Sequence, residues 1–342
     1  MVMSKKHTAH PTIIQVAEAA GVSKSTVSRV LQGDATSVKK ETRQAVQRAI
    51  RKLGYEHNAI ASSLRTSRTY MVMLITPDIA NPFWSEVARG LQDTLEHSGY
   101  SVVVGNGDHD PERESSFLKT AQRNRFDGVA INPTKIVSRT LLATGIPTVI
   151  LGIRDEFPGI DMVGSDSFQG TWEALTYLYQ MGHRRIGLID GRYAIEHSRA
   201  RSQAYVEFLK QHDLLYDPAL KVEVPFDREG GQRGMRVLLS LAQRPTAVFA
   251  SNDILAIAAM QAAQEAGLSI PRDLSIIGMD DIYPTAMTTP GLTTLSKQKY
   301  ETGCQAARLL LERIQGKAPR EARRCALPCK LVERGSVSAP HD

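Results

Sequence analysis

Residues 12–31 read TIIQVAEAAGVSKSTVSRVL, and this stretch decides the fold of the N-terminal part of the chain. The residues before Gly21 place small apolar side chains on one side of a short helix. Gly21 ends that helix, because glycine adopts a left-handed turn without strain. Ser23 is a candidate N-cap for a second helix, in which Val27, Val30 and Leu31 recur at helical spacing. The stretch therefore predicts a helix, a three-residue turn and a helix over residues 13–20, 21–23 and 24–32.

A third amphipathic pattern follows over residues 40–53. Its inward-facing positions are apolar: Val46, Ala49, Ile50 and Leu53. Its outward-facing positions are basic: Arg43, Arg48, Arg51 and Lys52. Three such helices predict a helix-turn-helix head, in which the second helix enters the major groove of DNA.

The charge of the chain is unevenly distributed and supports this prediction. Residues 1–68 hold 12 Lys and Arg against 4 Asp and Glu, a net charge of +8, whereas the rest holds 30 against 32, a net charge of −2. A basic head on a near-neutral body suggests that the head meets a polyanion. A solvated lysine-rich helix surface is the alternative explanation, and the helix-turn-helix pattern favours DNA.

Length and composition exclude several classes of protein. The 342 residues are 42% hydrophobic and 23% charged, which is typical of a globular chain with two or three folded units. We find no apolar run of about 18 residues and no secretory signal at the N-terminus. Three cysteines argue against a disulfide framework. We therefore expect a cytoplasmic protein without a membrane segment.

Beyond residue 68, short apolar runs alternate with longer amphipathic stretches. The runs predict buried parallel strands at residues 71–75, 101–104, 128–131, 148–151, 186–189, 247–250 and 274–277. The stretches between them predict helices near residues 84–98, 113–123, 168–181, 199–211, 231–241 and 253–266. This alternation predicts two α/β lobes with parallel sheets, helices on both faces, and a ligand crevice at the carboxyl ends of the strands.

Chemistry assigns DNA-contacting roles in the head. Lys24, Ser25 and, one turn later, Arg29 are the expected base readers, because side chains at the start of the second helix point into the groove. Thr26, Ser28 and the basic pair at Lys39 and Lys40 are better suited to phosphate. For Thr26 and Ser28, local helix capping or exposure to solvent is the alternative explanation.

The head resembles that of the LacI/GalR family of bacterial transcriptional regulators. The residues that carry the resemblance are Thr12–Ala17, Ala20–Ser23, Thr26–Leu31, Glu41–Arg43, Ala49–Ile50, Leu53–Tyr55, Asn58, Leu64–Thr66 and Pro77–Phe83. It extends over almost the whole chain. It implies base contacts at Lys24, Ser25 and Arg29, and a core similar to periplasmic binding proteins.

The segment from Asn58 to Leu64 resembles the hinge helix of this family. That helix orders when two subunits lie on an operator, and its leucine, here Leu64, wedges between base steps in the minor groove. Asn58 also belongs to the expected DNA contacts. His57 stands where the family usually has proline, and Ser62 where it often has arginine. A plain linker is the alternative. The expected domains are a head over residues 1–56, a hinge over 57–69 and a core over 70–342.

Within the core, the resemblance implies three crossovers between the lobes. We expect residues 70–165 and 297–322 in the first lobe, and 166–296 and 323–337 in the second. Position at strand ends and at the lobe junction selects ten candidate effector-binding residues: Asn81, Phe83, Trp84, Arg154, Asp166, His197, Arg201, Phe226, Asn252 and Asp280. The resemblance implies ligand contacts at seven of them: Phe83, Trp84, His197, Arg201, Phe226, Asn252 and Asp280.

Two of these residues, Arg201 and Asp280, form a pair that can grip vicinal hydroxyl groups. A buried salt bridge, or a core position for Phe83 and Trp84, is the alternative. Arg154, Arg192, His197 and Arg201 make the cleft locally cationic, so a sugar acid or sugar phosphate is the favoured effector. A neutral sugar or a purine acting as co-repressor remains open. Ile195 stands where the purine-binding branch has a cation, which ranks the purine lower.

The sequence shows no catalytic constellation. We find no phosphate-binding Gly-Lys loop and no complete dinucleotide fingerprint, and Cys325 and Cys329 are too widely spaced for a zinc pair. A sugar-processing enzyme is thus a remote alternative, and we expect no cofactor and no metal. The expected partners are double-stranded operator DNA, a small effector and a second copy of the chain, because two heads read two half-sites. The C-terminal residues contain no leucine heptads, so we do not expect a tetramer built by a C-terminal coiled coil.

Overall fold

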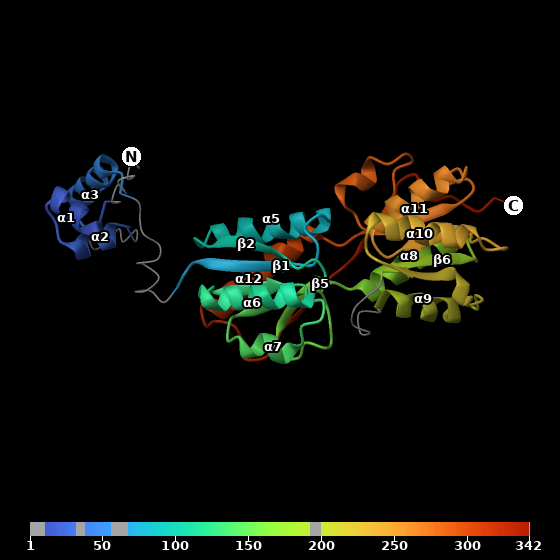
Figure 1. Ribbon diagram of the computed structural model, residues 1–342, viewed down its shortest axis with the longest axis horizontal. Helices are drawn as coiled ribbons and strands as arrows, with labels where there is room; N and C mark the ends of the chain where they lie inside the picture. The colour runs from blue at the N-terminus through green and yellow to red at the C-terminus, as the bar shows by residue number, and fades with distance from the viewer. Residues whose placement is uncertain (1–10, 32–37, 56–67, 192–199, 342) are drawn as a thin grey trace, which may run out of the picture. The chain divides into compact units, whose positions relative to one another are not determined.

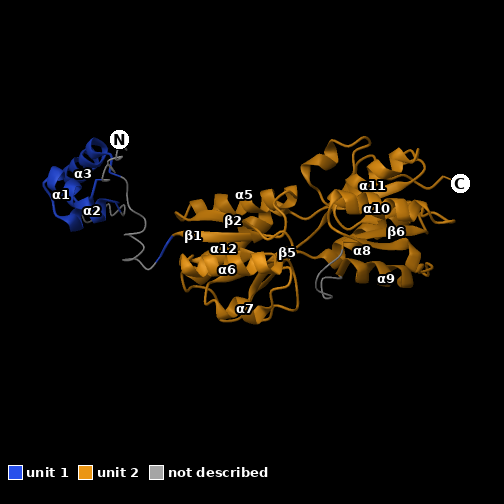
Figure 2. Cartoon of the chain, in the orientation of Figure 1, with its two compact units in different colours: residues 1–69 blue, residues 70–342 orange. Residues whose placement is uncertain are grey.

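The computed structural model describes residues 11–31, 38–55, 68–191 and 200–341. The chain divides into two compact units, residues 1–69 and residues 70–342 (Figure 2). We describe each unit by itself.

The first unit contains three helices: α1 (Ile13–Ala20), α2 (Lys24–Leu31) and α3 (Lys40–Leu53). Thr12 caps α1 in a capping box with Gln15, in which each side chain bonds to the other residue's backbone N–H. Gly21 ends α1 in the left-handed conformation with φ +64°. In the next turn, the backbone N–H of Thr26 donates to Oγ of Ser23 at 3.2 Å, so Ser23 caps α2.

The three helices enclose one small apolar core. Val16 and Ala17 of α1, Val27 of α2, and Val46 and Ala49 of α3 are buried in it. The helix bounds follow the pattern expected from the sequence, because the apolar positions of the three helices lie in this core or pack against it, with the exception of the exposed Ile14. The predicted helix-turn-helix architecture is confirmed in the described part of the head.

The second unit is built on two six-stranded sheets (Figure 1). The first sheet has the order β11-β5-β4-β3-β1-β2 and the second β12-β10-β9-β8-β6-β7. All neighbouring strands are parallel except β10 and β12, which are antiparallel. The strands are β1 (Met71–Thr76), β2 (Ser101–Asn106), β3 (Gly128–Ile131), β4 (Thr148–Leu151), β5 (Asp161–Ser165), β6 (Ile186–Gly191), β7 (Lys221–Val224), β8 (Ala247–Ala250), β9 (Ser275–Asp280), β10 (Thr293–Ser296), β11 (Arg324–Leu327) and β12 (Lys330–Val332).

Helices cover both faces of each sheet, and this defines two lobes (Figure 1). The first-lobe helices are α5 (Pro82–Glu96) and α12 (Lys299–Ile314) on one face, and α6 (Pro111–Arg123) and α7 (Ser138–Ala143) on the other. The second-lobe helices are α8 (Ser167–Gln180) and α9 (Ala200–Gln211) on one face, and α10 (Arg228–Leu239) and α11 (Asp253–Glu265) on the other. Two 3₁₀ turns, Pro218–Leu220 and Tyr283–Ala286, complete the second lobe.

Three crossover segments join the lobes and bond to one another. Oγ of Ser165, at the end of β5, donates to the carbonyl of Lys297 at 2.7 Å. Nε2 of Gln298 donates to the carbonyl of Pro328 at 2.7 Å. These bonds tie the second crossover to the first and to the third, so the three segments form one connected hinge region.

One expected lobe boundary is wrong. The sequence assigned residues 323–337 to the second lobe, but β11 pairs in parallel with β5 of the first sheet, with Arg324 opposite Met162. Pro328 then separates β11 from β12, which joins the second sheet. A long-range contact decides this pairing, because Arg323 bonds to the buried Asp161 through both its backbone and its guanidinium.

Candidate functional site

The exposed face of α2 carries the three expected base readers. Lys24, Ser25 and Arg29 are all exposed at the surface of the head. Oγ of Ser25 lies 2.8 Å from Oγ of Ser23, so its rotamer is linked to the cap of the helix. A surface helix with two cations and a hydroxyl on one side has the donors that guanine edges and phosphates accept from.

The residues expected at phosphates divide into two groups. Lys39 and Lys40 are exposed at the start of α3, whereas Thr26 is half-buried. Ser28 is buried with 9% of its surface exposed, since it follows Val27 of the head core, and we leave it out of the proposed DNA contacts. The hinge residues Asn58 and Leu64 lie outside the described residues, as do His57 and Ser62.

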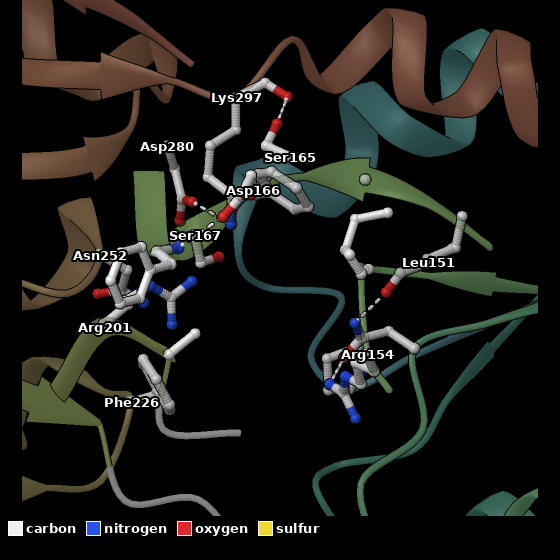
Figure 3. A pocket seen from close by; sticks show the side chains of 18 of the residues that line it. Leu151, Arg154, Ser165, Asp166, Ser167, Arg201, Phe226, Asn252, Asp280 and Lys297 are labelled. Atoms are coloured by element: carbon white, nitrogen blue, oxygen red, sulfur yellow. Dashed lines mark hydrogen bonds and ion pairs between the residues drawn. The ribbon is translucent and has the colours of Figure 1, made fainter. Parts of the chain in front are cut away.

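The second unit holds a cavity of about 1620 Å³ between its two lobes. Nine of the ten effector candidates line it: Asn81, Phe83, Trp84, Arg154, Asp166, Arg201, Phe226, Asn252 and Asp280. The tenth, His197, lies outside the described residues, together with Arg192 and Ile195. Figure 3 shows Leu151 and Arg154 on one side of the cavity, and Arg201, Asn252, Phe226 and Asp280 on the other.

Helices from both lobes begin at this cavity, each capped by a candidate residue. Asn81 caps α5 through a bond from the N–H of Phe83, and Asn252 caps α11 through a bond from the N–H of Leu255. Asp166 caps α8. Because helices that follow parallel strands start at the carboxyl edge of the sheet, their positive ends meet in the cleft.

Aromatic residues line the cavity from both lobes. The rings of Phe83 and Trp84 pack edge to face with centroids 4.8 Å apart, and each residue is 9% exposed. Both belong to the first-lobe core and also line the cavity. Phe226 is half-buried and packs over the backbone of Gly191, where any Cβ would lie 1.9 Å from its ring.

Asp280 forms an ion pair with Lys297, a residue that was not among the candidates. Its Oδ1 lies 3.3 Å from Nζ of Lys297, whereas Nε of Arg201 donates to Sδ of Met279 at 3.4 Å. Arg201 and Asp280 both line the cavity, and their expected role in gripping vicinal hydroxyl groups stays a prediction. Lys297 was not among the candidates because β10, the strand that it directly follows, was not predicted.

Hydrogen bonds fix the positions of Arg154 and of the helix turn that carries Arg201. Arg154 follows β4, and its guanidinium donates to the carbonyl of Pro133 at 2.5 Å and to Oδ1 of Asn132 at 3.3 Å. Burial lowers the pKa of Arg154, and the charge of Arg201 lowers it further. Arg201 lies in the first turn of α9, which Ser202 anchors by donating to Oδ2 of Asp190 at 2.6 Å.

Two searches of the described ranges complete the site. Residues 11–31, 38–55, 68–191 and 200–341 contain no group of three His, Cys, Asp or Glu side chains placed to hold a metal ion. In the same ranges, no helix combines the length and apolar character needed to cross a bilayer.

Two family models match the chain. Residues 12–58 match the model of bacterial regulatory proteins of the lacI family, which covers α1 to α3. Residues 175–337 match the model of a periplasmic binding protein-like domain. These two matches confirm the combination of a helix-turn-helix head with a periplasmic-binding-protein-like core.

Similar proteins match over nearly the full length. The transcriptional repressor CytR of Escherichia coli K12 is 33% identical over 341 residues, 98% of this chain and 99% of that protein. A structure of the regulator CelR with cellobiose is 30% identical, with TM-score 0.72, and covers 95% of this chain and 99% of its own. The lac repressor dimer bound to operator and the anti-inducer ONPF has TM-score 0.86 at 27% identity, over 96% and 99%. These relatives are regulators and not enzymes, and the chain belongs to the LacI family of bacterial transcriptional repressors.

Proposed function

We propose that the chain represses transcription as a homodimer on operator DNA and that a small anionic sugar derivative, a sugar acid or a sugar phosphate, controls this binding from the cleft. The observation that carries the effector class is the pair of guanidinium groups, Arg154 and Arg201, which face each other from the two lobes (Figure 3).

Like charges on opposite walls make a site for an anion. Burial lowers the pKa of Arg154, the carboxylates of Glu156 and Glu114 raise it, and the charge of Arg201 lowers it by a smaller amount. The two cations therefore repel each other across the cavity. An anionic group between them pairs with both and draws the two lobes together. Arg154 has five N–H donors, and two bonds to Pro133 and Asn132 leave donors for such a group.

The helix termini act in the same direction. The positive ends of α5, α8 and α11 meet at the cavity, and helix N-termini attract carboxylate and phosphate. Asn81 caps α5 with a neutral amide, and the first turn of α5 holds no acidic residue, so its dipole is uncompensated there. Asn252 caps α11 with a neutral amide as well, but Asp253 lies in the first turn of that helix. Only α8 is capped by a carboxylate, Asp166.

The cavity also supports recognition of a sugar ring. Asn252 and Asp280 are each 5% exposed and border the cavity, where amide and carboxylate groups take hydroxyls. Phe226 offers a ring face next to them. The CelR structure, which is 30% identical, is a complex with cellobiose. The neutral sugar and the purine remain as the competing effector classes.

In the proposed mechanism, lobe closure shifts the contacts between subunits and so changes the spacing of the two heads. Two heads are needed because a near-palindromic operator presents two half-sites. The lac repressor structure is a dimer on operator. Coupling of this type amounts to about 1–3 kcal/mol and is reciprocal between effector and DNA.

A ligand panel on the full chain tests the effector class. Each anionic compound is paired with its neutral parent: ribose 5-phosphate with ribose, glucose 6-phosphate with glucose, and gluconate with glucitol; adenine and guanine are included. At 100 times Kd, a ligand adds about 2.7 kcal/mol of stability, which raises the Tm by roughly 5–10 °C. Stabilisation by anionic members alone supports the proposal. Stabilisation by neutral sugars or purines alone contradicts it.

A further inference from the structure

We propose that Lys297 sets the charge class of the effector: it pairs with Asp280, so that this carboxylate does not offset the charges of Arg154 and Arg201 and the site selects anionic over neutral sugars. This inference rests on the proposed function, because it names a residue that lets the same cleft distinguish anionic from neutral ligands.

Lys297 lies where the hinge region and the cavity meet. It directly follows β10, and its carbonyl accepts the hydrogen bond from Ser165 that ties two crossovers together. Its side chain is 13% exposed and turns into the cavity. Figure 3 shows Lys297 reaching toward Asp280 above Arg201. The ammonium group is thus part of the cavity wall.

The ammonium group contacts both lobes. It lies 3.3 Å from Oδ1 of Asp280, at the end of β9 in the second lobe. It also lies 4.9 Å from the ring centroid of Phe83, on α5 of the first lobe, within the range of a cation–π contact. These two partners hold the charge in one place.

Asp280 is held in place as well. Its backbone has φ 129°, a strained conformation for an aspartate. Nζ of Lys299 donates to the carbonyls of Asp280 and Asp281 at 3.0 and 2.5 Å, and Asp253 accepts a bond from the N–H of Ile282 at 2.9 Å. The turn therefore keeps the carboxylate of Asp280 directed at Lys297.

Charge balance gives Lys297 its effect on selectivity. Asp280 without a partner would offset the charge of Arg201 and repel an anion, whereas the paired Asp280 does not. Charges in a partly closed cleft interact more strongly than in water, so one neutralised carboxylate changes the attraction for an anion substantially. Burial lowers the pKa of Lys297, the Asp280 carboxylate raises it, and the charge of Arg201 lowers it, so the contact with Asp280 favours the charged form of Lys297.

Calorimetric titration of the full chain with ribose 5-phosphate and ribose, or whichever panel pair binds, tests this role. The quantity measured is the ratio of the Kd of the neutral sugar to the Kd of its anionic partner. Lys297→Gln leaves Asp280 unpaired and should lower this ratio at least about tenfold, which corresponds to about 1.4 kcal/mol. Asp280→Asn should raise it. The double variant restores the balance and should return the ratio to within about threefold of wild type.

Matched controls separate charge selection from structural damage. Lys119→Gln makes the same charge change on the exposed surface of α6 and should leave the ratio unchanged. Lys297→Arg keeps the charge and should keep the preference for the anion. A purely structural role predicts equal losses for both sugars and no recovery in the double variant.

The experiment distinguishes a failure of this inference from a failure of the proposed function. If the wild-type protein binds anionic sugars and Lys297→Gln leaves the ratio of the two Kd values unchanged, the role of Lys297 is overturned. The proposed function then still stands. Wild type that binds no anionic member of the panel overturns the proposed function, and the inference with it.

Discussion

The carboxylate of Asp161 and the guanidinium of Arg313 form two parallel hydrogen bonds, 2.7 Å from Nη2 to Oδ1 and 2.9 Å from Nε to Oδ2. Arg323 adds a bond of 2.7 Å to Oδ2, and the Asp161 side chain is fully buried. Asp161 begins β5, whereas Arg313 lies at the end of α12 and Arg323 precedes β11. This one carboxylate therefore joins the late part of the chain to the first sheet.

Asp161→Asn should destabilise the core by about 2–4 kcal/mol, because it leaves two partly buried guanidinium groups without their anion. Urea unfolding at pH 7 measures the loss. Asp155→Asn is the control, since Asp155 pairs with Arg324 in a largely exposed ion pair worth at most about 1 kcal/mol. Equal effects of the two substitutions would show that the Asp161 cluster is not a major stabilising contact.

The same cluster predicts a pH dependence. The bonds from Arg313 and Arg323 lower the pKa of Asp161 to about 2, against the rise that burial alone would cause. A depressed carboxyl pKa contributes stability above the ordinary value near 4, about 2 kcal/mol here, and loses it as the pH falls from about 4 toward 2. The difference in unfolding free energy between wild type and Asp161→Asn should therefore shrink below about pH 4. A difference that stays constant from pH 7 to pH 2.5 contradicts this.

Arg29→Ala should weaken binding to the operator and leave binding to random DNA nearly unchanged. The exposed guanidinium of Arg29 on α2 is placed to donate to a base edge, and one such contact is worth about 1–3 kcal/mol. Fluorescence anisotropy on an operator selected from random sequences measures both affinities. The control Arg48→Ala removes the same charge from an exposed position of α3. If Arg29→Ala weakened both kinds of DNA equally, its role would be contact with phosphate.

Arg154→Gln and Arg201→Gln should each reduce affinity for the anionic effector by roughly 10- to 100-fold, because each removes one of the two facing cations. Affinity for the neutral parent sugar should change by less than about threefold. Calorimetric titration measures both, and Arg244→Gln at an exposed loop position is the matched control. Equal losses of affinity for the anionic effector and its neutral parent would mean that these arginines shape the cleft but do not recognise the charge of the ligand.

Gly191→Ala should weaken effector binding through Phe226. The new Cβ would lie 1.9 Å from the Phe226 ring, so the ring must leave its position at the cavity wall. If this is the cause, the loss from Gly191→Ala should match that from Phe226→Ala, and the double variant should lose no more than either single variant. Additive losses would place the effect of Gly191 elsewhere.

The head was predictable from the sequence because its determinants are local. The capping of α1 by Thr12, the left-handed Gly21 and the capping of α2 by Ser23 all act within three residues. Nine of the residues chosen by their position at strand ends and at the lobe junction also line one cavity. Choice by strand ends works because parallel strands of one sheet end at the same edge.

The elements that the sequence did not predict depend on distant partners. Strand β10, Thr293–Ser296, is largely hydroxylated and lacks the apolar pattern of a buried strand. It is buried because Oγ1 of Thr294 donates to Asp253 at 2.6 Å and the N–H of Thr293 donates to Ser336 at 2.8 Å. Because β10 was not predicted, Lys297 could not be recognised as a residue at a strand end, and its ion pair with Asp280 was not foreseen. Strand β5 was missed in the same way, since Asp161 is neutralised from more than 150 residues away.

The operator affinity of the full chain, measured with and without a saturating concentration of the panel's best anionic effector, tests the central claim most directly. Trp84, in the cavity wall, and Trp172, stacked on the cavity residue Phe168, are the two tryptophans of the chain and provide a fluorescence signal for saturation. The account predicts that the operator Kd changes by about 5- to 150-fold and that the operator changes the effector Kd by the same factor. An operator Kd that is the same with and without bound effector would contradict it.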